Sequence, residues 1–196
     1  MLQAIHDRRS IRQFQERDIP RETVEKIIQA GMLAPSAKNR QPWRFVIAQG
    51  ASKRSMLASM ARGLKREQVS PLLPARAAML QGAVRTLRVM EQAPVVIFIL
   101  ERHGTTLHAS PDVETRVYER CDMQSIGACL ENIALTATTL GLSSLWIGDI
   151  YFAYDELRSW LRRDEELAAA LALGYADEQP PARPRLPINA MVEWRS

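Results

Sequence analysis

Three arginines and a serine lie close together near the start of the chain. Arg8, Arg9, Ser10 and Arg12 offer guanidinium donors and a hydroxyl, and the planar guanidinium fork matches the oxygens of a phosphate. An exposed basic helix end would give the same pattern, because runs of charge are usually solvated. The cluster indicates a phosphate site only if other parts of the chain converge on it.

A second polar segment runs between Pro35 and Pro42. The prolines fix the backbone, and Asn39 and Gln41 carry amide groups that can donate to and accept from a planar heterocycle. An ordinary loop that follows a helix has a similar composition. The segment is therefore a candidate ligand-binding loop.

A third candidate lies near the end of the chain. Arg183 and Arg185 flank Pro184 in a segment that must be extended. Alternate residues of an extended chain point to the same side, so both could close on an anion held by Arg8 and Ser10. A solubilising tail is the plain alternative.

Ile147 and Gly148 end a short apolar run. A glycine at a strand end lets the backbone approach a flat ligand closely, although a strand-to-helix turn would use one too. His6, His103 and His108 lack the spacing of metal ligands, and no Ser-His-Asp or Cys-His set is evident. We expect no metal and no catalytic side chain of those kinds.

Composition and charge limit the class of protein. The chain has 196 residues, 46% hydrophobic and 24% charged, which are ordinary globular proportions. Its net charge is +4, but residues 1–66 carry 14 basic and 5 acidic side chains, a net charge of +9. That imbalance indicates either a compact site for an anionic ligand or a nucleic-acid-binding face.

Several features suit a cytoplasmic protein. The longest apolar run, Ala93–Leu100, is too short to cross a bilayer, and no signal peptide is visible. Cys121 and Cys129 lie two helical turns apart on one helical pattern, too far for a disulfide. We expect both to be reduced thiols.

Hydrophobic periodicity predicts one domain, residues 1–196, in which helices and strands alternate. The expected strands are Phe45–Ala48, Val95–Leu100, Ser143–Ile147 and Leu167–Tyr175. The expected helices are Leu2–Asp7, a helix from Pro20 to about Ala34, residues 51–66, a basic helix through Met79, Val84 and Leu87, residues 119–140 and Tyr154–Arg162. Arg102–Pro111 is expected to be a loop, and the proline-rich end an extended arm. This order predicts an α+β or α/β three-layer plan with about four or five strands.

Four sequence blocks span nearly the whole chain in a fixed order. They are RRSIRQF at Arg8–Phe14, APSAKNRQPWRF at Ala34–Phe45, DMQSIGACLENIALTATTLGLSSLWIG at Asp122–Gly148, and LALGYADEQPPARPR at Leu171–Arg185. With these blocks the sequence resembles the nitroreductase family of FMN-dependent, NAD(P)H-dependent oxidoreductases. The resemblance implies an α+β, nitroreductase-like three-layer fold with a small mixed sheet flanked by helices, and a homodimer that exchanges its C-terminal arm.

The resemblance also implies an FMN site shared between two protomers. By it, Arg8 and Ser10, with Arg9 beside them, hold the phosphate and ribityl chain, Arg183 and Arg185 close over the phosphate, and Arg12 lies near the pyrimidine edge. The partner supplies Pro35, Ser36, Ala37, Asn39 and Gln41, and the backbone of Ile147 and Gly148 lies near flavin N5. Asp122 and Asn132 fall on a long interface helix with structural roles. Lys65, Arg66 and Gln68 are candidates for the ring edge.

The implied activity is ping-pong hydride transfer from NAD(P)H, through FMN, to an electron-poor acceptor such as a nitroaromatic or quinone. Reductive dehalogenation and flavin breakdown are alternatives on the same fold, which Arg102–Tyr118 and residues 62–76 would distinguish as lid segments. A basic nucleic-acid-binding module is the alternative from another class, but no set of stacking aromatics accompanies the basic residues. We therefore expect a small-molecule acceptor as substrate, and neither nucleic acid nor membrane as partner.

Overall fold

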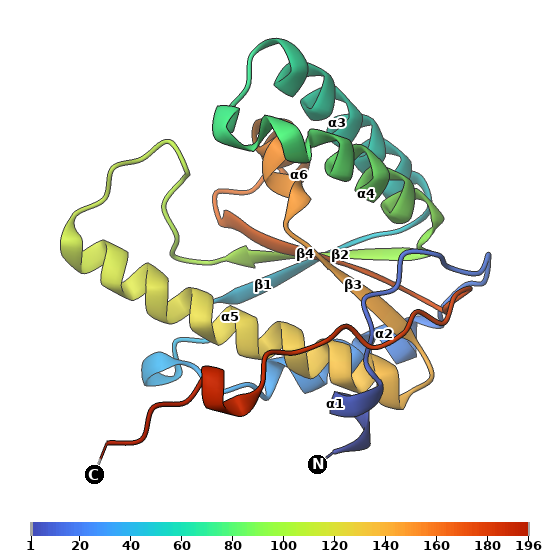
Figure 1. Ribbon diagram of the computed structural model, residues 1–196. Helices are drawn as coiled ribbons and strands as arrows, with labels where there is room; N and C mark the ends of the chain where they lie inside the picture. The colour runs from blue at the N-terminus through green and yellow to red at the C-terminus, as the bar shows by residue number, and fades with distance from the viewer. Residues whose placement is uncertain (1, 196) are drawn as a thin grey trace.

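A computed structural model describes residues 2–195, and a four-stranded sheet runs through its middle (Figure 1). The strands are β1 (Trp43–Ala48), β2 (Val95–Glu101), β3 (Ser143–Ile147) and β4 (Glu166–Gly174), in the order β1-β2-β4-β3. The two central strands, β2 and β4, are buried along their whole length, as expected for apolar runs that show no alternation. The four strands predicted from the sequence are confirmed, with ends that differ by one or two residues.

Helices cover both faces of the sheet. Figure 1 shows α3 (Gly50–Val69), α4 (Leu80–Gln92) and α6 (Tyr154–Leu161) above it, and α2 (Arg21–Met32) and α5 (Val113–Thr139) below it, with α1 (Gln3–Asp7) beside α5. Short 3₁₀ helices η1 (Ala37–Asn39), η2 (Pro74–Met79), η3 (Asp149–Ala153) and η4 (Ile188–Ala190) lie in the connections. This is the expected three-layer α+β plan. Within residues 2–195, no helix is both long and apolar enough to cross a lipid bilayer.

The strands pair differently from the mixed sheet that we expected. All three strand pairs are antiparallel, because α3 runs out from the end of β1 and α4 brings the chain back to the same end, so that Ala48 pairs with Val96. In the part of the chain that is described, parallel pairing is limited to one isolated bridge, between Ser10 and Ser144. The expectation of a sheet with both parallel and antiparallel strand pairs was therefore wrong.

Close packing fixes α5 beneath the sheet. Its buried residues include Ile126, Leu130 and Ile133, which join α2 and the lower face of the sheet in one core. Gly31 of α2 lies so close that a Cβ there would be 2.6 Å from Cγ1 of Ile133. Burial also raises the pKa of Cys129 to about 12, so its thiol stays protonated. Helix α5 is therefore held rigidly, and it fixes the positions of the segments that are bonded to it.

The helix α5 begins earlier than its hydrophobic pattern predicted. It starts at Val113, where we expected about residue 119, because the Asp112 carboxylate accepts a hydrogen bond of 2.7 Å from the Thr115 backbone N–H and caps the first turn. The expected loop from Arg102 to Pro111 is confirmed. Only its continuation to Tyr118 as a lid was wrong, since residues 113–118 are helical.

The packing of α3 against η3 gives the first testable prediction. Gly63→Ala should lower the free energy of unfolding by about 1–3 kcal/mol, because the new methyl would lie 2.3 Å from Cβ and 2.4 Å from Cα of Ala153. Helix propensity alone would favour this change by about 1 kcal/mol. Urea unfolding of the purified variants measures the difference.

The matched control is Gly82→Ala in α4, where the nearest atom to the new Cβ is the flexible Arg85 Nη2 at 3.9 Å. This control should be as stable as the wild type or more so, since alanine favours a helix. If both variants gained stability, the close approach of α3 and η3 would be contradicted.

Candidate functional site

The basic cluster of the N-terminal segment runs along the outer edge of β3. Ser10 forms a bridge with Ser144, and the Ile11 backbone N–H donates to the Ser144 carbonyl at 3.1 Å. Arg8 is half-buried, with Nε 3.7 Å from Glu131 Oε1 of α5. Arg9 donates to the carbonyl oxygens of His6 (2.6 Å) and Arg8 (2.8 Å). Arg9 thus closes the end of α1, whereas Arg8 keeps donors for a ligand.

The start of the C-terminal arm is tied to the same segment. The Glu178 carboxylate accepts hydrogen bonds from the backbone N–H groups of Arg12 and, at 3.2 Å, Gln13. The Arg12 guanidinium turns back to the Ser10 carbonyl at 3.1 Å. The start of the C-terminal arm and the N-terminal segment therefore lie side by side next to Ser10 and Arg12.

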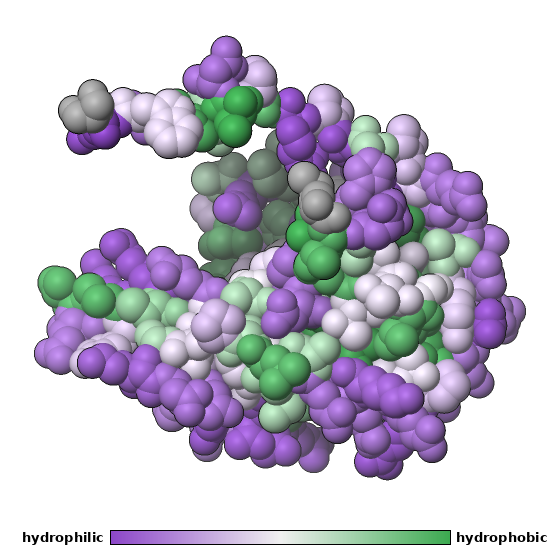
Figure 2. Space-filling model, turned by 90° about the horizontal axis from the view of Figure 1, so that it is seen from below, coloured by the Kyte–Doolittle hydropathy of each residue, from purple (hydrophilic) through white to green (hydrophobic). Residues whose placement is uncertain are grey.

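The arm itself leaves the body of the molecule, and Figure 2 shows it standing clear of the rest of the surface with apolar side chains along it. Arg183 and Arg185 are exposed, and the Arg185 guanidinium donates to the Arg183 carbonyl at 3.2 Å. In residues 2–195 no hydrogen bond or ion pair joins either of them to Arg8 or Ser10. Their closure over a phosphate remains a prediction.

The segment between Pro35 and Pro42 forms a tight, internally braced loop. Lys38, Asn39 and Gln41 have positive φ angles of 55°, 53° and 47°. The Gln41 backbone N–H donates to Ser36 Oγ at 3.0 Å, and the Gln41 side-chain amide donates to Asn39 Oδ1 at 3.2 Å. These bonds hold Pro35, Ser36, Ala37, Asn39 and Gln41 as one unit.

Arg40 anchors this loop to the long helix. Its guanidinium makes three hydrogen bonds, of 2.9–3.2 Å, to the two carboxylate oxygens of Asp122, which is 1% exposed. These bonds raise the pKa of Arg40 above its usual value. Asn132 likewise donates to the Ala30 carbonyl of α2 at 3.3 Å. Asp122 and Asn132 both hold the fold together, in agreement with their expected structural roles.

The loop and the basic cluster are attached to different parts of α5. Asp122, the anchor of the loop, and Glu131, the neighbour of Arg8, are nine residues apart in the helix. At 1.5 Å of rise per residue this is roughly 13 Å along the axis. One chain therefore holds the two groups of candidate residues apart.

The end of β3 leaves room for a flat molecule. Ile147 is buried, whereas Gly148 is exposed, and a Cβ built on Gly148 would have no atom within 4 Å. The peptide at Gly148 is thus open to an approaching ligand. Asp149, the next residue, begins η3 and accepts a hydrogen bond from the Thr86 hydroxyl of α4.

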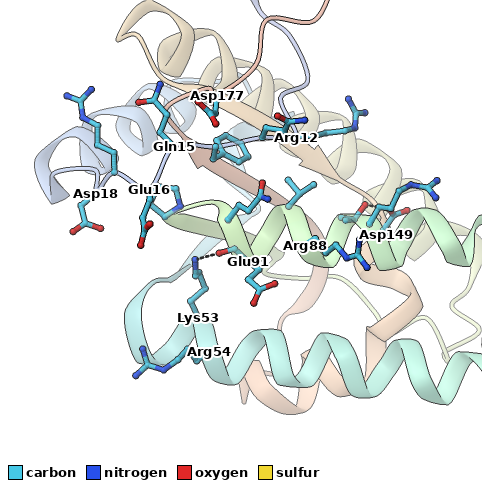
Figure 3. Close-up of a pocket in the computed structure, with 18 of the residues that line it drawn as sticks. Arg12, Gln15, Glu16, Asp18, Lys53, Arg54, Arg88, Glu91, Asp149 and Asp177 are labelled. Atoms are coloured by element: carbon cyan, nitrogen blue, oxygen red, sulfur yellow. Dashed lines mark hydrogen bonds between the residues drawn. The ribbon is translucent and has the colours of Figure 1, made fainter.

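A cavity of about 1200 Å³ lies beside this strand end, between residues 12–18, the start of α3, and α4 (Figure 3). It exceeds the roughly 300–1,000 Å³ of typical ligand pockets. Of the predicted cofactor-binding residues, only Arg12 lines it, facing Arg88 and Asp149 across the cavity, with Arg85 also in its lining.

The arginines of α4 are therefore site candidates that the sequence reasoning missed. Arg85 and Arg88 are three residues apart and share one helical face, a spacing that was visible in the sequence. Our candidates in residues 62–76 do not line the cavity. Arg66 instead pairs with Glu156 of α6, with Nε 3.1 Å from Oε1, so it joins two helices.

The chain is similar to known proteins over most of its length. The family model described as the nitroreductase family matches residues 5–175. A provisionally named NADH dehydrogenase/NAD(P)H nitroreductase of Archaeoglobus fulgidus is 33% identical over 183 residues, which cover 91% of this chain and 86% of that protein. An NADH dehydrogenase of Thermus thermophilus is 25% identical, over 96% of this chain and 92% of that protein.

Two solved structures have a similar fold. A provisionally named nitroreductase from Desulfovibrio desulfuricans, crystallised with FMN, superposes with a TM-score of 0.74 at 26% identity, covering 100% of this chain and 96% of that one. An FMN- and NADPH-dependent nitroreductase from Sphigopyxis sp. strain HMH gives a TM-score of 0.75 at 21% identity, covering 99% and 98%. The expected fold class is confirmed.

The anchor of the loop gives the second testable prediction. Arg40→Ala should lower the free energy of unfolding by about 3 kcal/mol, because it leaves the Asp122 carboxylate buried without its cation. Replacing Asp122 with alanine as well should restore part of that stability, since no lone carboxylate remains. Chemical unfolding of the two variants measures this, and a double variant no more stable than Arg40→Ala would contradict the anchor.

Proposed function

Because the chain belongs to the nitroreductase family, we propose that it is an FMN-dependent oxidoreductase that passes hydride from NAD(P)H to an electron-poor small molecule, such as a nitroaromatic or quinone, in a ping-pong sequence. We further propose that residues 1–196 form one nitroreductase-like domain. The single observation that carries the proposal is that the basic cluster Arg8–Arg12 and the open backbone at Gly148 lie along the same edge strand, β3, with Ser10 bridged to Ser144 and Gly148 directly after Ile147.

The donor groups along that edge fit a flavin nucleotide. Arg8 and Ser10 suit the phosphate and the ribityl hydroxyls, since guanidinium groups bind phosphate by charge-assisted hydrogen bonds. The open backbone at Gly148 suits the flat ring, because a side chain there would fill the space. Bound FMN supplies a ring that accepts hydride from one substrate and gives it to the next.

The protein's part is to bind and orient the ring and to adjust its charge. Arg12, with Arg85 and Arg88 lining the same cavity, presents positive charge near the strand end. A cation beside the pyrimidine edge of a flavin stabilises the negative charge that reduction places there. We assign this role to Arg12, and we add Arg85 and Arg88 as candidates for the ring edge.

A shared site explains why one chain holds its candidate residues apart. The Pro35–Gln41 loop would serve the flavin of the partner, and Arg183 and Arg185 would close over the phosphate when the arm is exchanged in a homodimer. The arm carries large apolar side chains that are mostly exposed, among them Leu186 (69%), Ile188 (77%) and Trp194 (90%). Burial of such a segment against a second copy would stabilise the pair.

Part of the basic charge in residues 1–66 is paired with carboxylates from the rest of the chain, which favours a small anionic ligand over nucleic acid. Arg40 pairs with Asp122, Arg44 with Glu165, and Arg66 with Glu156. Lys53 donates to carbonyl oxygens of Glu91 and Ala93, both at 2.7 Å. These cations close internal contacts and do not form a continuous basic surface.

The third testable prediction concerns the phosphate. Arg8→Ala should weaken FMN binding at least tenfold, because a charge-assisted hydrogen bond contributes about 1.5–3 kcal/mol. Arg21→Ala is the matched control, since Arg21 is exposed and paired only with Glu25, and it should leave FMN affinity unchanged. Fluorescence titration of the apoprotein measures both, and equal affinities in the two variants would refute the phosphate assignment.

The fourth prediction concerns assembly. If each flavin is held by two chains, FMN affinity should fall as the protein is diluted below its dimer dissociation constant, because mass action links the two equilibria. Flavin absorbance in analytical ultracentrifugation follows both at once. Flavin that sediments with monomers would rule out a shared site.

A further inference from the structure

Two glutamates lie buried next to each other, where β2 ends and β4 begins. Glu101 and Glu166 are direct partners in the antiparallel register and are 4% and 6% exposed. In residues 2–195, Oε1 of each has no hydrogen-bond partner. Two carboxylates cannot both stay ionised in such a place without compensation, because burial and like charge each raise the free energy of the charged form.

The turn that follows β2 brings the two side chains together. A Cβ built on Gly104 would lie 2.6 Å from Glu101 Oε2 and 2.8 Å from Glu166 Cβ, so both side chains pack beneath the same residue. Gly104 begins the loop that runs to Asp112, and this loop closes over a cavity of about 410 Å³ lined by both glutamates. The carboxyl pair therefore forms the base of that loop.

Burial raises the pKa of Glu166, but Tyr154 and Arg158 oppose this shift and favour its ionised form. Its Oε2 accepts hydrogen bonds from the Tyr154 hydroxyl, at 2.8 Å, and from the Arg158 guanidinium. The Tyr154 hydroxyl in turn accepts from the Leu107 backbone N–H at 2.9 Å. A chain of bonds thus runs from Glu166 through Tyr154 to the middle of the loop, and it requires Glu166 Oε2 to be an acceptor.

Glu101 has no cation in hydrogen-bond contact. Burial, and after it the charges of Asp122, Glu119 and Glu166, raise its pKa to about 7 against the opposing charge of Arg40. The charged and titratable groups that face the pair or line its cavity are Arg116, Glu119 and Asp122 from α5, Arg40 from the segment before β1, Tyr151 from η3, and Tyr154 and Arg158 from α6. Glu101 is therefore the member of the pair that carries a proton.

We propose that Glu101 and Glu166 form a proton-binding site, in which protonated Glu101 donates to Glu166 Oε1 and holds the loop Arg102–Asp112 closed. A proton on Glu101 removes one of the two buried charges and leaves a single negative charge for Arg158. Loss of this proton places a second charge beside Glu166, which weakens the bonds through Tyr154 to Leu107. No cluster suited to a metal ion occurs in the described residues 2–195, so a proton is favoured over a metal as occupant.

The test compares the wild type with Glu101→Gln, whose neutral amide cannot lose a proton. The pKa of Glu101 is raised in the folded state from 4.5 to about 7, so its stabilising effect is complete below pH 4.5 and is lost as the pH rises through 7. Between pH 4.5 and 8 the folding equilibrium constant of the wild type should fall by on the order of a hundredfold more than that of Glu101→Gln. Urea unfolding across this range measures it.

The matched control is Glu165→Gln, one residue from the pair. Glu165 pairs with Arg44, and its pKa is lowered by a hydrogen bond from its own backbone, with that cation adding. In Glu165→Gln the stability should still fall as the pH rises through 7, as it does in the wild type, because a group with a lowered pKa titrates only in acid.

Two direct readouts distinguish the proton from other occupants. At pH 6 the infrared spectrum of the wild type should contain a carboxylic-acid C=O band that Glu101→Gln lacks, and the Leu107 amide should lose hydrogen-exchange protection in the wild type above pH 7 once intrinsic rates are corrected. Equal pH dependence in both proteins with no acid band would overturn the proposal. So would stabilisation by Mg²⁺ or ammonium ions in the wild type alone, since a cation would then occupy the site.

Discussion

The long helix α5 fixes the distance between the two groups of residues that could hold a flavin. It packs between α2 and the lower face of the sheet closely enough that a single methylene at Gly31 would collide with Ile133, so it cannot shift to bring them together. Asp122 holds the loop before β1 through Arg40, and Glu131 lies beside Arg8 further along the helix. In the proposed dimer, the loop of one copy would reach the basic cluster of the other, so that both groups would serve one flavin.

The two ends of the chain differ in how firmly they are attached to the rest of the fold. The N-terminal segment and the start of the arm are joined by backbone hydrogen bonds, in which the Asp177 N–H donates to the Gln13 carbonyl and the Gln15 N–H donates to the Tyr175 carbonyl; these bonds keep Ser10 against β3. Beyond Glu178 the arm makes few contacts and exposes apolar side chains. The chain thus has a firmly attached basic segment beside β3 and an arm that is largely exposed. In the proposed dimer, a second copy would add its own residues to the flavin site and would bury the apolar side chains of the arm.

Local signals in the sequence predicted most of the fold. The continuous apolar run that became β2 could only be a strand covered on both faces, and Pro35 ended α2 as its missing donor requires. The early start of α5 was also predictable, from Asp112 and Thr115 at capping distance, but the apolar pattern alone concealed it. The antiparallel pairing depended on how α3 and α4 turn back, which no local signal determines.

The site was predictable only in part. Arg8, Ser10 and Arg12 stand out because they are close in sequence, whereas Arg85 and Arg88 enter the cavity through the packing of α4. The Glu101–Glu166 pair could not be found at all, since it depends on the register between two strands 65 residues apart. Long-range register and helix packing bring such groups together, and a pattern read along the chain does not contain them.

The shared site is tested most directly by combining two defective chains. One carries Arg8→Ala, and the other carries Asn39→Asp, which keeps a residue that tolerates the left-handed backbone but replaces its amide donor. Co-expressed with different tags and purified as mixed dimers, they should recover one intact flavin site, so FMN absorbance should exceed that of either parent dimer. Mixed dimers that bind no more FMN than their parents would show that both groups act within one chain, and the account would be wrong.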